Sequence, residues 1–157
     1  PIEALEPFKL EMPRQDPIPV KYLQETHRTL YDINLEVQLK LADSGDSITV
    51  SKSNYKHLYW SISQQLAHHT VSGCNMRTGD LLASGTISGR TNHALGSMVE
   101  LTSNGKIPLQ LANGTSRAFL EDGDEVIMRA WSRAQDYRVG FGSVSGLILP
   151  PAFAYEM

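Results

Sequence analysis

Strict alternation of apolar and polar residues marks residues 31–41. Every odd-numbered position there is apolar, and the residues between are Asp, Asn, Glu, Gln and Lys. A two-residue period is typical of a strand with one buried and one solvated face. A turn-forming segment follows at residues 43–46, and the alternation resumes over residues 47–51. The pattern predicts a β-hairpin.

The period changes in the next segment. Apolar residues fall four positions apart, at Leu58, Ile62 and Leu66. This spacing predicts the principal helix, at about residues 54–69. Ser53 or Asn54 can cap its first turn, and Gly73 is suited to ending it in the left-handed conformation.

Strands and turns are expected elsewhere. Short apolar runs predict strands at residues 81–83 and 98–102, and longer ones predict strands at residues 125–131 and from Tyr137 onward. Turn dipeptides and tripeptides stand at residues 104–105, 113–114 and 122–124. The first 24 residues hold five prolines and are expected to be extended and irregular. The fold class is mainly β, a mixed β-sandwich or roll with one principal helix.

Composition narrows the class of protein. With 157 residues, 41% of them apolar, the chain is long enough for one domain with a sizeable core. The net charge is -3 and the basic residues are scattered, which argues against a nucleic-acid partner. No apolar run approaches the ~20 residues of a membrane-spanning helix. The single cysteine, Cys74, fits a reducing compartment, and we expect a cytoplasmic location.

The candidate chemistry lies around residues 85–89. Gly85 and Gly89 enclose two hydroxyl residues, Thr86 and Ser88, in a loop where the backbone can approach a ligand closely. Glu100 stands between Val99 and Leu101 in the predicted strand 98–102, where a carboxylate needs a partner or a chemical role. From the residues alone, Glu100 is either a catalytic acid or a buried structural one.

Other possible motifs are weaker. Adjacent residues on a helix point ~100° apart, so His68 and His69 are poorly placed to share one metal ion. The glycines of residues 140–146 have the wrong spacing for a dinucleotide loop, and no helix follows them. Asp122 and Asp124 could bind calcium, but an Asp-Gly-Asp sequence is more often a turn.

Several blocks of the sequence resemble the C-terminal catalytic domain of the fumarylacetoacetase family. They are Lys52-Ser-Asn-Tyr55, Gln64-Gln-Leu-Ala-His-His69, Gly79-Asp-Leu-Leu-Ala-Ser-Gly-Thr-Ile-Ser-Gly89, Phe119-Leu-Glu-Asp-Gly-Asp-Glu-Val126 and Tyr137-Arg-Val-Gly-Phe-Gly142. The resemblance extends over nearly the whole chain. It implies hydrolysis of a carbon–carbon bond in 4-fumarylacetoacetate, a small β-diketo acid, in tyrosine and phenylalanine breakdown.

The resemblance also implies roles for two residues and for groups outside the sequence. Glu100 matches the acid that orients the catalytic histidine, and Thr86 matches a substrate-binding residue. A divalent ion, Mg²⁺ or Ca²⁺, and a homodimer are implied as well. The family's catalytic histidine and metal ligands have no counterpart here, so we expect residues 1–157 to be the C-terminal part of a catalytic domain. Its missing upstream part would then contact this chain, and the chain alone would be inactive.

The resemblance is poor at residues 90–95. His93 in this stretch could be proposed as a substitute base, but an exposed loop residue is the preferred interpretation. Two alternatives to the hydrolase stay open. One is a non-catalytic binding or assembly module, and the other is a related reaction such as acylpyruvate hydrolysis or oxaloacetate decarboxylation.

Overall fold

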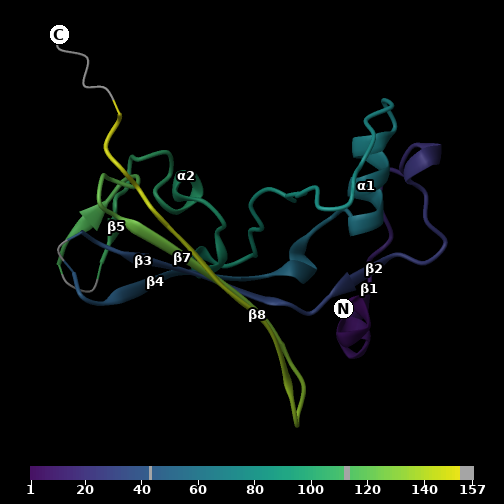
Figure 1. The fold of residues 1–157 in the computed structure, drawn as a ribbon, viewed down its shortest axis with the longest axis horizontal. Helices are drawn as coiled ribbons and strands as arrows, with labels where there is room; N and C mark the ends of the chain where they lie inside the picture. Colours follow the sequence, from purple (N-terminus) through teal and green to yellow (C-terminus); the bar gives the residue numbers. More distant parts are fainter. Residues whose placement is uncertain (43, 112–113, 153–157) are drawn as a thin grey trace.

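A four-stranded antiparallel sheet in the order β4-β3-β7-β8 organises the fold (Figure 1). The computed structural model describes residues 1–42, 44–111 and 114–152. The strands of this sheet are β3 (Asn34–Lys40), β4 (Ser47–Asn54), β7 (Glu125–Arg133) and β8 (Arg138–Leu147). The predicted hairpin is confirmed as β3 and β4, and the two later strands are confirmed as β7 and β8. The predicted hairpin turn includes Asp43, which lies outside the described residues.

Shorter elements surround this sheet. Two further sheets have two strands each, β1 (Lys9–Glu11) with β2 (Thr29–Tyr31) and β5 (Leu109–Gln110) with β6 (Ser116–Arg117). The α-helices are α1 (Ile62–Thr70) and α2 (Met98–Leu101), and the 3-10 helices are η1 (Ile2–Phe8), η2 (Lys21–Leu23), η3 (Tyr55–His57) and η4 (Asn92–Ala94). Strands dominate, so the mainly β class is confirmed. Among the described residues, no helix has the length and apolar character to cross a membrane.

One cluster of buried apolar residues lies at the end of the sheet that holds Leu39. Leu39 is 1% exposed and packs with Leu41 and Leu111, and partly buried residues from β4, β5 and β7 surround them. The odd positions of the alternating segment are buried at its two ends. Leu35 and Val37, in the middle, are only half-buried. The apolar face of the sheet is therefore partly open.

The principal helix begins later than its apolar spacing predicts. The helix α1 starts at Ile62, because Ser61 accepts a hydrogen bond from the Gln64 amide while the Gln64 side chain accepts one from the Ser61 amide. This reciprocal capping box satisfies two amides that a helix start leaves unpaired. Asn54, a predicted cap, caps the short η3 instead. Gly73 has φ +87, as predicted for a helix stop.

Two predicted strands are wrong. Residues 81–83 pair with no strand among the described residues, and Leu81 is 95% exposed. Residues 98–101 form the helix α2, because Ser97 accepts a hydrogen bond from the Glu100 amide and so caps a helical turn. The first 24 residues also differ from the expectation. They contain η1, β1 and η2, and they bury side chains such as Phe8 and Leu23.

Candidate functional site

The loop of residues 85–89 packs directly against the segment that leads into α2. Gly85 has φ +78, a conformation that favours glycine. A β-carbon on Gly96 would lie 2.9 Å from the Ile87 nitrogen, so the two backbones touch there. The Gly89 amide donates a hydrogen bond to the Ala94 carbonyl at 2.7 Å. The glycines thus allow the close docking of loop and helix.

This docking surrounds the carboxylate of Glu100 with hydroxyl groups. The Ser88 Oγ lies 2.8 Å and 2.7 Å from the two carboxylate oxygens of Glu100. The Ser97 hydroxyl donates to one of these oxygens at 3.0 Å. The hydrogen bond from Ser88, followed by that from Ser97, lowers the pKa of Glu100 below its ordinary value. Glu100 is exposed and helical, which corrects the expectation of an acid in an apolar strand.

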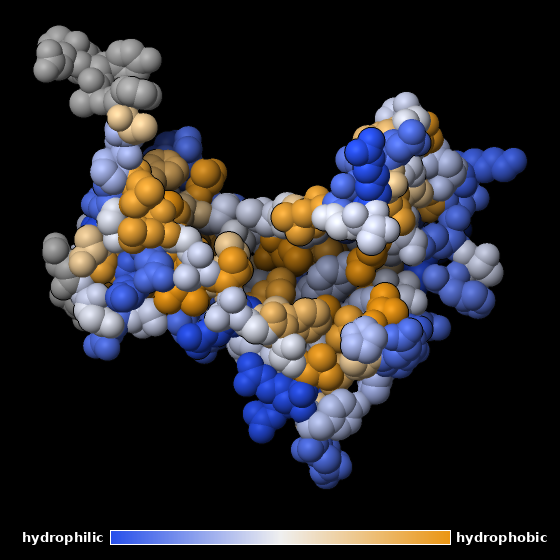
Figure 2. Space-filling model, viewed as in Figure 1, coloured by the Kyte–Doolittle hydropathy of each residue, from blue (hydrophilic) through white to orange (hydrophobic). Residues whose placement is uncertain are grey.

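Thr86 stands beside two apolar hollows. One has a volume of about 290 Å³ and is lined by Thr86 together with residues of β3, β4, α2 and β7. The other, of about 520 Å³, extends from Thr86 along the sheet to Phe141 and Val144. Figure 2 shows apolar side chains gathered in the hollowed middle of this face. Among the described residues, Thr86 lines both hollows and Glu100 lines neither. The two candidates are connected through Ser88, which lies two residues after Thr86 and hydrogen-bonds to Glu100.

The histidine candidates have separate neighbours. The Tyr22 hydroxyl and the His68 Nδ1 lie 2.9 Å apart, and the two rings stack. The Nε2 of His69 lies 3.4 Å from the sulfur of the exposed Cys74. His93 is exposed on η4, as predicted. His57, which sequence analysis did not consider, places its ring against Gly89, where a β-carbon would lie 3.0 Å from its Nε2.

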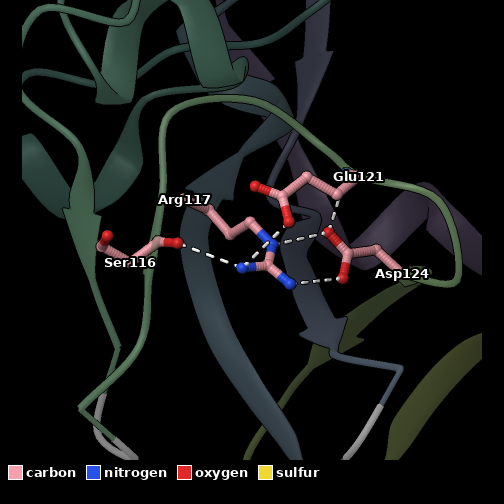
Figure 3. A network of polar contacts seen from close by, with 4 residues as sticks. All are labelled: Ser116, Arg117, Glu121 and Asp124. Atoms are coloured by element: carbon pink, nitrogen blue, oxygen red, sulfur yellow. Dashed lines mark hydrogen bonds and ion pairs between the residues drawn. The ribbon is translucent and has the colours of Figure 1, made fainter.

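Asp124 is an ion-pair partner rather than an open calcium ligand. It is completely buried, and the Arg117 guanidinium donates to both of its oxygens, at 3.0 Å and 3.2 Å (Figure 3). The Glu121 amide donates to Asp124 as well, at 2.9 Å. Gly123 has φ +88, which supports the predicted turn at residues 122–124. Asp122 is exposed on this turn.

The residues present do not fit a metal ion by themselves. Within residues 1–42, 44–111 and 114–152, no three His, Cys, Asp or Glu side chains come close enough together to hold one. The carboxylate oxygens of Glu100 and Asp124 are already engaged by hydroxyl and guanidinium groups.

The fold and the site define a class of protein, a β-rich domain in which a glycine-bounded loop with hydroxyl side chains docks beside an exposed carboxylate. Residues 13–146 match the family described as fumarylacetoacetate (FAA) hydrolase, C-terminal, and the chain belongs to this family.

Named relatives agree with this assignment. The chain is 53% identical over 149 residues to fumarylacetoacetase of Arabidopsis thaliana, covering 95% of this chain and 35% of that protein. It is 49% identical over 150 residues to fumarylacetoacetase of Homo sapiens, covering 96% of this chain and 36% of that protein. The corresponding protein of Dictyostelium discoideum is 48% identical over 151 residues, covering 95% of this chain and 35% of that protein. The chain thus spans about a third of the length of these curated relatives.

Ser88 is recognisable in the sequence as a loop hydroxyl, but its contact with Glu100 and the part played by Ser97 were not predicted. The Ser97-Met-Val-Glu100 spacing is that of a capping box, and this signal could have identified both the helix and the serine. No local signal could have shown the contact of Ser88, because it depends on the docking of the loop against Gly96.

Proposed function

We propose that this chain is the C-terminal part of the catalytic domain of a hydrolase that cleaves a carbon–carbon bond of 4-fumarylacetoacetate. The products would be fumarate and acetoacetate, in the breakdown of tyrosine and phenylalanine. The family membership and the names of the relatives support this proposal. The structural observation that carries it is the Glu100 carboxylate, which two serine hydroxyls orient beside the Thr86 loop.

Glu100 is suited to orienting an imidazole. The carboxylate is ionised at neutral pH, as an ordinary glutamate is, and the serine hydroxyls lower its pKa further, so it can accept a hydrogen bond from an imidazole N–H. A fixed carboxylate in this position selects one tautomer of the histidine and stabilises the protonated ring after it has taken a proton from water. The histidine itself would come from sequence outside this chain.

Thr86 is proposed to contact the substrate. Its exposed side chain lies at the rim of the two hollows, where a hydroxyl can donate to a carbonyl or carboxylate oxygen of a β-diketo acid. The Mg²⁺ or Ca²⁺ ion, the homodimer and the cytoplasmic location expected for the family belong to this proposal as well. No group of three His, Cys, Asp or Glu side chains among the described residues could hold this ion.

One observation favours a second candidate, a non-catalytic assembly module. Met128, Phe141 and Val144 are each at least half exposed on one face of the sheet, and apolar surface of this kind often binds another protein segment. The same face would be covered within a larger catalytic domain. An activity measurement on variants of the proposed site separates the two candidates.

Glu100→Gln and Thr86→Val in the full-length protein provide this test. With fumarylacetoacetate as substrate, Glu100→Gln should lower kcat by up to ~10⁴-fold, by analogy with the orienting acid of a serine protease, and change KM little. Thr86→Val should raise KM more than it lowers kcat, because it removes a contact made already in the bound substrate. Glu121→Gln, which removes an exposed carboxylate elsewhere, is the matched control. Near-normal kcat in a folded Glu100→Gln protein, checked by thermal melting, would contradict the proposed role.

A further inference from the structure

Ser88 joins the two halves of the proposed site. Its Oγ accepts a hydrogen bond from the Gly96 amide at 2.9 Å, which leaves its own proton free to point at Glu100. Both carboxylate oxygens of Glu100 lie within 2.8 Å of this Oγ. Because Ser88 follows Thr86 by two residues, one short segment contacts both the proposed substrate position and the acid.

The backbone on either side of Ser88 is anchored. On one side, Ile87 lies so close to Gly96 that a β-carbon would fall 2.9 Å from its nitrogen and 3.0 Å from its oxygen. On the other side, the Gly89 amide bonds to the Ala94 carbonyl at 2.7 Å. A side chain held between two such anchors keeps its orientation, which is the property that a supporting residue needs.

Ser97 contacts Glu100 too, but it has a structural task. Its Oγ accepts from the Glu100 amide at 3.3 Å and so caps α2, and it donates to only one carboxylate oxygen. Ser88 lies outside the helix and contacts both oxygens. Loss of the Ser88 hydroxyl therefore leaves the cap of α2 in place, removes a restraint on the carboxylate and takes this acceptor from the Gly96 amide.

We propose that Ser88 is a positioning residue of this hydrolase, whose hydroxyl holds the Glu100 carboxylate in the orientation that engages the catalytic imidazole and ties it to the Thr86 loop. This inference rests on the proposed function. Ser88 acts through Glu100, so its effect should fall on turnover and should depend on the presence of the carboxylate.

Kinetics of the full-length enzyme with fumarylacetoacetate test the inference. Ser88→Ala should lower kcat roughly ten- to hundredfold, the range of a hydrogen bond to a charged group, with KM changed by less than about threefold. Ser84→Ala is the matched control, because Ser84 directly precedes the loop of residues 85–89 and its hydroxyl bonds only to the adjacent Gly85 carbonyl among the described residues. It should keep kcat within about twofold of the parent.

Two variants of equal shape separate loss of the hydroxyl from misfolding. Ser88→Thr keeps the hydroxyl and should retain activity, whereas Ser88→Val has the same shape without the hydroxyl and should behave like Ser88→Ala. Equal kcat values for the Thr and Val variants would overturn the inference, whatever the stability of Ser88→Ala.

Two further readouts exclude a merely structural role. In a Glu100→Gln background, Ser88→Ala should cause no additional loss of kcat, and an undiminished loss there would overturn the inference. In ¹³C NMR, the Glu100 carboxyl should titrate at higher pH in Ser88→Ala, because the bond that lowers its pKa is gone. Near-normal kcat in Ser88→Ala alongside an inactive Glu100→Gln would overturn this inference and spare the proposed function. Near-normal kcat in Glu100→Gln would overturn the proposed role of Glu100 and this inference with it, whereas absence of fumarylacetoacetate turnover in the parent protein would overturn the proposed function.

Discussion

Removing one partner of the ion pair between Arg117 and Asp124 should be one of the most destabilising single changes in this fold. Asp124 is completely buried, and the Arg117 side chain is only 15% exposed. The two N–H donors of the guanidinium match the two carboxylate oxygens, which is the strong, two-pronged form of this contact. The pair closes the turn that leads into β7.

Asp124→Asn removes the charge and keeps the size of the side chain. It leaves a largely buried guanidinium without its two-pronged partner, and it weakens the acceptor for the Glu121 amide. Breaking a buried ion pair by removing one partner costs about 3–5 kcal/mol. A carboxylate oxygen of Glu121 also lies 3.3 Å from the Arg117 guanidinium, so Glu121 can offset part of the lost attraction. Its side chain is 61% exposed, which limits this compensation. We therefore expect the lower end, about 3 kcal/mol.

Equilibrium unfolding in urea measures this cost, with the fluorescence of the two tryptophans, Trp60 and Trp131, as the signal. For an m value of about 2 kcal/mol/M, a loss of 3 kcal/mol lowers the midpoint by about 1–2 M. Glu121→Gln is the control and should cost less than about 1 kcal/mol, because its carboxylate is exposed. Equal midpoints for Asp124→Asn and Glu121→Gln would refute the reasoning, since burial would then make no difference.

Two further predictions concern other residues. Gly96→Ala should destabilise the protein by about 1–3 kcal/mol in urea unfolding, because the added β-carbon would clash with the Ile87 backbone. Gly140→Ala is the control and should cost less, because no described atom lies within 4 Å of its β-carbon. The Tyr55 hydroxyl is buried without a hydrogen-bond partner among the described residues, and burial, followed by the neighbouring Tyr31, raises its pKa to about 12. Since the folded state then holds this proton more tightly than the unfolded state, stability should fall as pH rises from about 10 to 12. In thermal melts, the Tyr55→Phe protein should not lose stability in this way between about pH 10 and 12. At neutral pH it should be up to about 1 kcal/mol more stable than the parent. An unchanged loss of stability at alkaline pH in Tyr55→Phe would contradict the assignment to Tyr55.

The sheet was predictable because its signal repeats along the chain. In residues 31–41 the alternation persists through eleven positions, so several side chains agree on one strand orientation. The partner strand and the two later strands have similar, shorter signals. The open middle of the sheet was not predictable, because the exposure of Leu35 and Val37 depends on what packs over them.

The two wrong strands have a common cause. Residues 81–83 and 98–101 are short apolar runs, and a short run does not distinguish a strand from a helix or from extended chain. At residues 98–101 a better signal was present in the Ser97 cap, as it was for α1 in Ser61 and Gln64. Capping residues act within one turn, so they can be recognised from sequence even where apolar spacing is ambiguous.

The sequence singles out Thr86 and Glu100 as candidate site residues, whose roles stay predictions, but it does not indicate how their side chains are arranged. Thr86 is a candidate because glycines enclose its loop, and Glu100 is a candidate because it is an acid between apolar neighbours. The bond between Ser88 and Glu100 spans twelve residues of sequence and exists only because Ile87 docks on Gly96. Likewise, nothing in the Asp-Gly-Asp turn indicates that Arg117 reaches Asp124. Contacts of this kind come from tertiary packing, which a local pattern does not encode.

The exposure of Glu100 changes the reason for assigning it a function. A buried acid would need partners simply to offset the loss of its hydration, so its hydrogen bonds would say little about chemistry. An exposed acid has water available, and contacts at its surface add little stability. Yet Ser88 and Ser97 both donate to Glu100, and two glycines allow the loop to approach closely enough for the first of these bonds. These contacts fix the orientation of the Glu100 carboxylate. A fixed orientation is useful mainly when the carboxylate has to hydrogen-bond to another group, such as the proposed imidazole.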